Sequence, residues 1–228
     1  MSSPSTMALN LTGSRRFYEA HRVPLRLLFS LLLRVRARDL QRLPRTGGVV
    51  LVCNHLTDLD PLLLATLLPR QLHFMAKEEL FRFKPLGWWL RQTGTFPVRR
   101  GEVDRAALRH AEALLRAGHA VMVFPEGHRS ATAQLQEARA GAVLLASRTG
   151  CPILPLAIAG TEHLSWKGQT GRSGLRRLHR PLVRIRAGEL IHVDATSKGR
   201  GRKEAADSVM RQIVSLLPPA YHGVYARQ

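Results

Sequence analysis

The chain of 228 residues has only two cysteines, Cys53 and Cys151, and both lie in apolar stretches. So few cysteines do not suit a disulfide framework or a cysteine-based metal site, and we expect a reducing, cytoplasmic setting. The chain also lacks any uncharged apolar run of the roughly 18–20 residues that span a bilayer, since the longest near the N-terminus is Leu27–Leu33. Arginines and no small-residue cleavage site follow that run, so we expect no signal peptide.

Acidic residues and lysines are scarce. The chain has 16 Asp and Glu against 35 Lys and Arg, a net charge of +19, and only five of the basic residues are lysine. Such a charge favours a polyanionic partner, namely nucleic acid, an anionic membrane surface or a phosphorylated substrate, although an arginine-rich genome gives the same composition. Aromatic residues are only 6% of the chain and no zinc-finger, helix-turn-helix or RNP spacing occurs, so we expect no nucleic-acid partner.

Residues 15–38 have the pattern of a basic amphipathic helix. Large apolar residues recur at helical spacing from Leu25 to Leu32, and arginines lie along the opposite edge. Such a helix either lies in a membrane interface with its arginines at the lipid phosphates, or packs on the core with its arginines in water. We favour the membrane and predict an N-terminal helical membrane-association segment over residues 1–44, followed by one domain over residues 45–228.

Beyond residue 44, apolar runs of strand length alternate with stretches of helical periodicity. This alternation predicts an α/β fold with a mainly parallel central sheet flanked by helices. The expected strands are residues 48–53, 72–76, 95–98, 120–124, 153–159 and 182–191. The expected helices are residues 61–68, 83–93, 103–117, 139–148 and 203–217.

A histidine and a carboxylate follow the first of these strands, in the stretch Asn-His-Leu-Thr-Asp-Leu-Asp that ends at Asp60. His55 and Asp60 cannot share a helix face, because five steps of about 100° place them roughly 140° apart. They can meet if a strand ends at the histidine and a helix begins near the aspartate. An open α/β sheet usually carries its active site at such strand ends. We therefore predict that His55 pairs with a carboxylate of this stretch, Asp60 or the competing Asp58.

Three further polar blocks follow later strands. They are Gly-Thr-Phe-Pro-Val-Arg-Arg ending at Arg100, Phe-Pro-Glu-Gly-His-Arg-Ser ending at Ser130, and Cys-Pro-Ile-Leu-Pro with the Gly-Thr-Glu that ends at Glu162. In order and spacing, the four blocks resemble the motifs of the glycerolipid acyltransferases, the family of bacterial 1-acylglycerol-3-phosphate acyltransferases. The resemblance covers residues from about Gly47 to Gly160. It implies acyl transfer from acyl-CoA or acyl-carrier protein to the sn-2 hydroxyl of 1-acylglycerol 3-phosphate, which forms phosphatidic acid in phospholipid biosynthesis.

The residues are chemically suited to this reaction. His55 can act as the general base on the alcohol, and Asp60 can hold its tautomer and stabilise the imidazolium. The leaving group needs little help, because a thiol of pKa about 8.5 leaves as a thiolate. No Gly-x-Ser-x-Gly elbow is present, so we expect direct attack by the substrate hydroxyl, with no cofactor and no metal ion.

The resemblance also implies a substrate-binding set. Arg100 matches the second-motif arginine linked to the glycerol phosphate, and a guanidinium suits phosphate because its donors are planar and bidentate. Gly127 permits a tight loop, and we interpret Glu126 as orienting Arg129 or a hydroxyl. Arg129 and Lys77 are further phosphate candidates.

Other acceptors and other classes of protein stay open. The same chemistry can act on glycerol 3-phosphate or another lysolipid. A basic nucleic-acid-binding module is a remote alternative, and a metal hydrolase using His55, Asp58 and Asp60 lacks a His-Glu-x-x-His or comparable cluster. For the enzyme we expect a peripheral, monotopic position on the cytoplasmic face of the cell membrane, with no transmembrane span.

Overall fold

The computed structural model describes residues 12–99, 104–164, 180–194 and 199–226. The strands are β1 Arg34–Arg38, β2 Val49–Cys53, β3 Leu72–Lys77, β4 Phe96–Val98, β5 Ala120–Val123, β6 Ile153–Ala159 and β7 Leu182–Ala187. The helices are α2 Arg15–Leu32, α3 Asp60–Leu67, α4 Lys84–Gln92, α5 Arg105–Arg116, α6 Gly141–Thr149 and α7 Arg200–Leu216.

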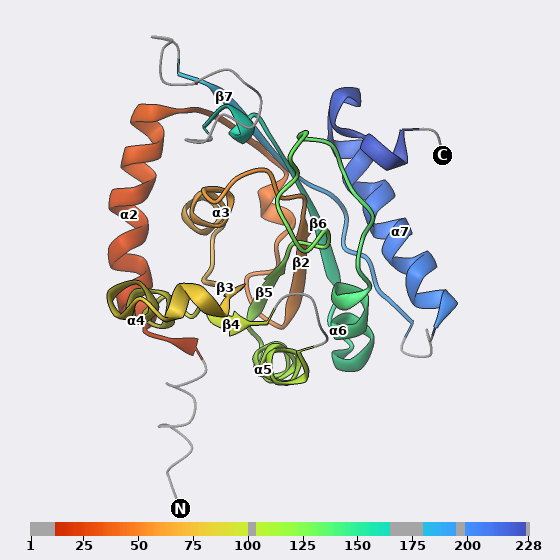
Figure 1. The fold of residues 1–228 in the computed structure, drawn as a ribbon, viewed down its shortest axis with the longest axis horizontal. Helices are drawn as coiled ribbons and strands as arrows, with labels where there is room; N and C mark the ends of the chain where they lie inside the picture. The colour runs from red at the N-terminus through yellow and green to blue at the C-terminus, as the bar shows by residue number, and fades with distance from the viewer. Residues whose placement is uncertain (1–11, 100–103, 165–179, 195–198, 227–228) are drawn as a thin grey trace, which may run out of the picture.

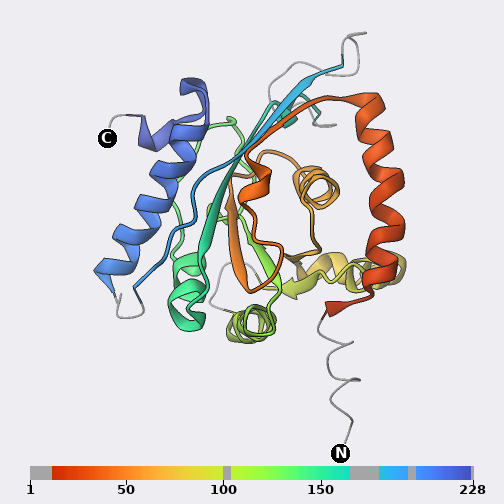
Figure 2. The ribbon, with the colours of Figure 1, turned by 180° about the vertical axis from the view of Figure 1, so that it is seen from behind.

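The seven strands form one sheet in the order β1-β7-β6-β2-β5-β3-β4. All neighbouring strands are parallel except β6 and β7, which run antiparallel. Figures 1 and 2 show α2 and α3 on one side of the sheet and α6 and α7 on the other. The predicted α/β fold with a mainly parallel sheet is confirmed.

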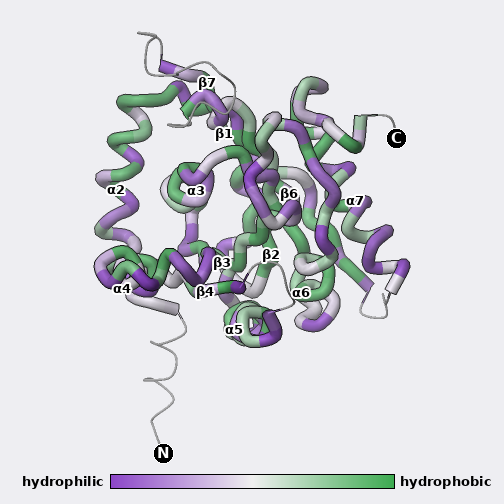
Figure 3. Tube along the Cα trace, viewed as in Figure 1, coloured by the Kyte–Doolittle hydropathy of each residue, from purple (hydrophilic) through white to green (hydrophobic). Residues whose placement is uncertain are grey.

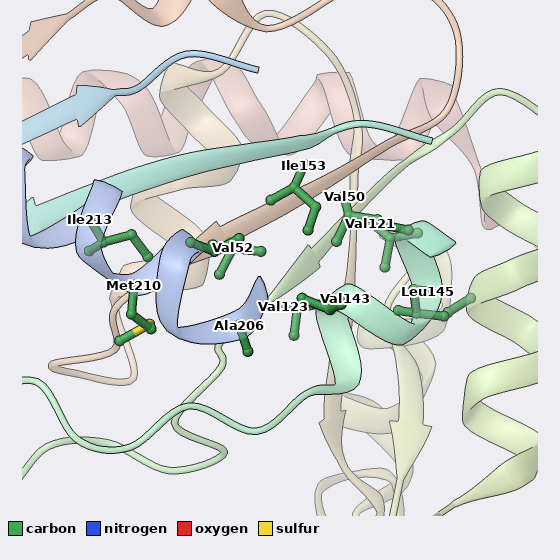
Figure 4. Close-up of a cluster of buried hydrophobic side chains, with 14 of the residues drawn as sticks. Val50, Val52, Val121, Val123, Val143, Leu145, Ile153, Ala206, Met210 and Ile213 are labelled. Carbon is green, nitrogen blue, oxygen red and sulfur yellow. The ribbon is translucent and has the colours of Figure 1, made fainter. Parts of the chain in front are cut away.

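Both faces of the sheet are buried, which explains the near-continuous apolar runs of its central strands. In β2 alternate residues enter different cores. Val50 and Val52 pack toward α5, α6 and α7, as Figure 4 shows for part of this cluster, whereas Val49, Leu51 and Cys53 pack toward α2 and α3. Every residue of β2, β5 and β6 is buried, so these strands form the centre of the domain.

The helix predicted over residues 15–38 is too long. α2 ends at Leu32, and Arg34–Arg38 forms the edge strand β1, which pairs with β7. Arginine alternates with Val and Ala in this stretch, which is the period of a strand, but the partner strand lies far along the chain. The strand predicted over residues 182–191 is also shorter than expected, because β7 ends at Ala187 and Ile191 forms only an isolated bridge with Ile153.

Asn54 completes the sheet at the point where β2 ends. β6 runs on past the last residue of β2, so Ile158 has no strand neighbour on that side. The Asn54 amide takes the place of a backbone amide: Nδ2 donates to the Ile158 carbonyl at 2.8 Å, and Oδ1 accepts from the Ile158 N–H at 2.9 Å. Since buried backbone groups must be paired, this contact fixes the chain immediately before His55.

Candidate active site

His55 and Asp60 form a buried hydrogen-bonded pair at the carboxyl end of β2. Nδ1 of His55 lies 3.0 Å from Oδ2 of Asp60. A carboxylate accepts hydrogen bonds, so Nδ1 carries the proton that joins it to Asp60, and in the neutral imidazole the lone pair is on Nε2. The ring also stacks on Phe124, with 4.1 Å between ring centroids and 20° between the planes. The histidine is thus held in one orientation, with a basic nitrogen left for a substrate.

Four donors surround the Asp60 carboxylate, which has no exposed surface. Besides the imidazole, the N–H groups of Leu56 and Thr57 donate to Oδ2 at 2.6 and 2.7 Å. The Thr57 hydroxyl donates to Oδ1 at 3.0 Å. A buried charge is tolerated only when it is paired and hydrogen-bonded, so these contacts explain both the tight loop after β2 and the start of α3 at Asp60.

Asp58, the competing carboxylate, points elsewhere. It is exposed and forms an ion pair with Arg129. His55, Asp58 and Asp60 therefore do not converge as the metal-hydrolase alternative requires. Within the described residues, no group of three or more His, Cys, Asp or Glu side chains is arranged to hold a metal ion.

Glu126 holds the backbone of His55 rather than Arg129 or a hydroxyl, which corrects the interpretation from the sequence. Oε1 accepts the N–H of His55 and Oε2 accepts the N–H of Gln136, both at 3.1 Å. The side chain is buried, and Arg129 is already paired with Asp58. The reason is physical, because a carboxylate with no access to solvent takes whatever main-chain donors lie beside it.

Burial raises the pKa of Glu126 to about 7, although the N–H groups of His55 and Gln136 oppose the rise. Cys53 is also buried, and its burial, together with the charges of Asp60 and Glu126, raises the pKa of its thiol. Cys53 and Cys151 are both free thiols, as expected.

His55 lies where two cavities meet. The first, the α5–α6 cavity, has a volume of about 500 Å³. Its apolar wall comes from β3, β5, α5 and α6, and includes Met122, Leu108 and Leu144. Gly127 and Arg139 from the loop after β5 also line it, and a Cβ on Gly127 would lie 3.0 Å from Nε of Arg139.

The second, the α2–α4 cavity, has a volume of about 480 Å³. Leu25 of α2, Leu62 of α3, Phe74 of β3 and Leu90 of α4 contribute to its apolar wall. Among the residues that the structure describes, three line both cavities: His55, Met75 and Phe124. Sites of this size and character are typical of bound small molecules.

The other residues predicted for the substrate site are distributed between these cavities. Arg129 and Lys77 line the α2–α4 cavity, and Lys77 also pairs with Glu79 at 3.6 Å. Gly127 has the expected left-handed backbone, with φ of 75°, but its N–H donates to the Phe124 carbonyl and so is not offered to an anion. Arg100 lies outside the described residues.

Sequence reasoning missed two features of the site. Arg202 reaches the α5–α6 cavity from α7, although it lies about 150 residues after His55 and no local pattern marks it. The two cavities themselves are built by elements far apart in the chain, so neither has a signature in any one segment.

This fold and this site belong to a family of enzymes. The acyltransferase family model matches residues 34–159, from β1 to the end of β6, and the chain is a member of that family. The matched range contains His55, Asp60, Glu126 and Arg129.

Two bacterial relatives and one solved structure carry the name of a single enzyme. The chain is 34% identical over 137 residues to the 1-acyl-sn-glycerol-3-phosphate acyltransferase of Bacillus subtilis. The matched region covers 60% of this chain and 68% of that protein. The chain is 30% identical over 154 residues to the enzyme of the same name from Streptococcus pneumoniae, covering 66% of this chain and 57% of that one. The crystal structure of the 1-acyl-sn-glycerophosphate acyltransferase PlsC of Thermotoga maritima superposes with a TM-score of 0.69 at 25% identity, covering 87% and 79% of the two chains.

The raised pKa of Glu126 predicts a pH-dependent stability. The folded protein holds this proton more tightly than the unfolded chain does between pH 4.5 and about 7. The stability gained from the protonated carboxyl is therefore complete below pH 4.5 and is lost as the pH rises through 7, by about 3 kcal/mol. Relative to Glu126→Gln, the wild type should lose that amount over this interval, as measured by urea unfolding at a series of pH values.

The control is Glu204→Gln, the same substitution at an exposed glutamate. If the Glu126→Gln and wild-type stability curves run parallel, the raised pKa is wrong.

Proposed function

We propose that the protein transfers an acyl group from a thioester donor, acyl-CoA or acyl-carrier protein, to the sn-2 hydroxyl of 1-acylglycerol 3-phosphate, which yields phosphatidic acid. One observation carries the proposal: a histidine oriented by a buried carboxylate lies at the junction of two apolar cavities. The reaction brings two acyl chains together at one hydroxyl, and two cavities meeting at His55 offer each chain its own place. The names of the relatives support the same reaction.

The residues suggest how the reaction proceeds. Nε2 of His55 accepts the proton of the sn-2 hydroxyl as the oxygen attacks the thioester carbonyl, and Asp60 stabilises the imidazolium that forms. The tetrahedral intermediate then collapses and breaks the C–S bond. The thiolate that leaves takes up the proton held by His55, which restores the neutral imidazole.

The phosphate of the acceptor is attached to the carbon next to the reacting one, so it must lie close to His55. Arg129 and Lys77 reach this region from the α2–α4 cavity. Together with Arg100, the arginine matching the family's second motif, they form the proposed phosphate site. Arg129 would have to exchange its ion pair with Asp58 for the phosphate, an exchange that bidentate guanidinium–phosphate geometry favours.

The position of α2 supports a peripheral site on a membrane. One side of the helix is attached to the domain: the Tyr18 hydroxyl donates to the Ala65 carbonyl, and the Arg22 guanidinium donates to the carbonyls of Thr66 and Leu68. Within the described residues, no helix has both the length and the apolar character to cross a bilayer.

The second half of α2 is largely hydrophobic along the chain, as Figure 3 shows. The exposed large apolar residues of α2 are Val23, Leu27, Leu28, Leu31 and Leu32. Phe83 and the indole of Trp88, from the start of α4 and its middle, are also exposed, and Trp88 meets Phe17 of α2 edge-on with 5.2 Å between ring centroids. We infer that this surface enters the interface of an anionic membrane on the cytoplasmic side, and that residues 1–44 are its main anchor.

Replacing His55 by alanine should lower kcat for acyl transfer by about 10²–10⁴-fold while the protein stays folded, because general-base catalysis is worth that much. Asp60→Asn should also lose most of the rate, since an amide cannot enforce the tautomer. Purified protein would be incubated with labelled acyl-CoA or acyl-carrier protein and a panel of lysolipids and glycerol 3-phosphate. His192→Ala, an exposed histidine, is the control. Near-normal turnover of His55→Ala would eliminate the general-base role.

Replacing Arg100 by alanine should raise KM for lysophosphatidic acid by about 10–100-fold and change kcat less, because a charge-assisted hydrogen bond is worth about 1.5–3 kcal/mol. The exposed Arg45 lines neither cavity, so Arg45→Ala should leave KM unchanged. An unaltered KM in Arg100→Ala would remove this residue from the phosphate site.

Leu31→Asp should weaken binding to vesicles containing anionic lipid by at least about tenfold, because it removes a leucine whose burial is worth 1.5–3 kcal/mol. Leu31 is 71% exposed, so the fold should be unaffected. The matched control is Leu190→Asp, which introduces the same charge at an exposed leucine between β7 and α7. Equal sedimentation of both variants with vesicles would show that α2 is not the anchor.

A further inference from the structure

Both main-chain polar groups of His55 bind the loop that follows β5. Its N–H donates to Oε1 of Glu126 at 3.1 Å, and its carbonyl accepts the N–H of Ser130 at 2.9 Å. The position of the imidazole therefore depends on the position of residues 126–130 as well as on Asp60.

This loop has no ladder of its own to hold it, because no helix or strand lies between Phe124 and Gly141. Hydrogen bonds within the loop shape it: the Gln136 N–H donates to Oε2 of Glu126, the Ser130 hydroxyl donates to the Gln134 carbonyl at 2.7 Å, and the Arg139 N–H donates to the Pro125 carbonyl at 2.9 Å. Further support comes from another part of the chain.

The segment Pro219–Tyr225 supplies that support. The Leu135 N–H donates to the Tyr221 carbonyl at 2.9 Å, and the Val224 N–H donates to the Leu135 carbonyl at 3.2 Å. The Tyr225 hydroxyl accepts the N–H of Ala138 at 3.3 Å. These three bonds are made to both sides of Gln136, the residue whose N–H fixes Glu126.

The contact is close as well as hydrogen-bonded. Leu135 is buried, and Tyr225 is buried with its hydroxyl 3.3 Å from Oδ1 of Asp207 in α7. Gly223 lies directly against Leu135, since a Cβ there would come within 2.1 Å of the Leu135 carbonyl oxygen. The segment thus connects the loop to the rigid helix α7.

We infer that the 219–225 segment positions His55 for the proposed acyl transfer, through Leu135, Gln136 and Glu126. Gly223 and Tyr225 are positioning residues in this arrangement, although neither lines the α5–α6 or the α2–α4 cavity. The inference rests on the proposed function only because kcat and KM are measured for the proposed acyl transfer. A displaced loop would leave the cavities able to bind substrate but move the histidine, and sub-ångström placement of the base governs the rate. The expected signature is therefore a lower kcat at an almost unchanged KM.

The test compares two glycine substitutions that both place alanine at a positive φ. Gly223 and Gly199 have φ of 54° and 50°, a backbone conformation that strains alanine at either position, but of the two only Gly223 has a neighbour that a Cβ would meet. Gly223→Ala should lower kcat at least about tenfold with KM within about threefold of the wild type. Gly199→Ala should leave both parameters unchanged.

A second pair of variants keeps the inference testable if Gly223→Ala does not fold. Tyr225→Phe removes the hydroxyl that holds Ala138, and Tyr221→Phe removes a hydroxyl that binds Glu162 but leaves the Tyr221 carbonyl on Leu135. Tyr225→Phe should lower kcat severalfold and Tyr221→Phe should not. In parallel, amide hydrogen exchange of residues 126–138 and of His55 should accelerate in Gly223→Ala and Tyr225→Phe alone.

The outcomes separate the two proposals. A wild-type protein that acylates none of the acceptors refutes the proposed function, whereas the exchange measurement still reports on the loop. A wild type that is active, with kcat or amide exchange unchanged in Gly223→Ala and Tyr225→Phe, overturns the positioning role. A raised KM with normal kcat in these variants overturns it as well, because the segment would then act on binding.

Discussion

The carboxylate of Asp60 is the charge around which the site is built. It lies in the interior, and its four hydrogen bonds come from one imidazole, one hydroxyl and two consecutive main-chain N–H groups. A buried carboxylate without these hydrogen bonds would cost several kcal/mol of folding free energy. The four bonds therefore hold the loop after β2 closed. The same hydrogen bonds that orient His55 therefore also stabilise the buried charge of Asp60 at the start of α3.

A second buried carboxylate, that of Glu126, accepts the main-chain N–H of the same histidine. Asp60 is five residues away and acts on the ring, whereas Glu126 is 71 residues away and acts on the main chain. Neither contact alone fixes both the rotation of the imidazole and the place of its Cα. The two blocks that carry these acids are thus parts of one structural unit.

Much of the fold could be predicted because its central strands are buried on both faces and stand out as apolar runs between helical stretches. β1 could not: its alternating arginines have the period of a strand, but its neighbour in the described sheet, β7, lies far along the chain. The choice of Asp60 over Asp58 followed from spacing and resemblance, and the structure places Asp60 against the ring. The partner of Glu126 is a backbone N–H, which carries no side-chain signature, and Arg202 reaches the site through tertiary packing alone.

The position of β1 in the sheet bears on the order in which the chain is assembled. Arg34 is paired with Leu182, 148 residues further along the chain. β1 can pair with β7 only after β7 has been synthesised, and non-local pairings of this kind form slowly. On the ribosome, β1 emerges long before its partner strand β7 exists, whereas α2 is soon followed by the residues of α3 that it binds. The N-terminal helix can therefore dock early, and the adjoining edge of the sheet is completed only when β7 has been made.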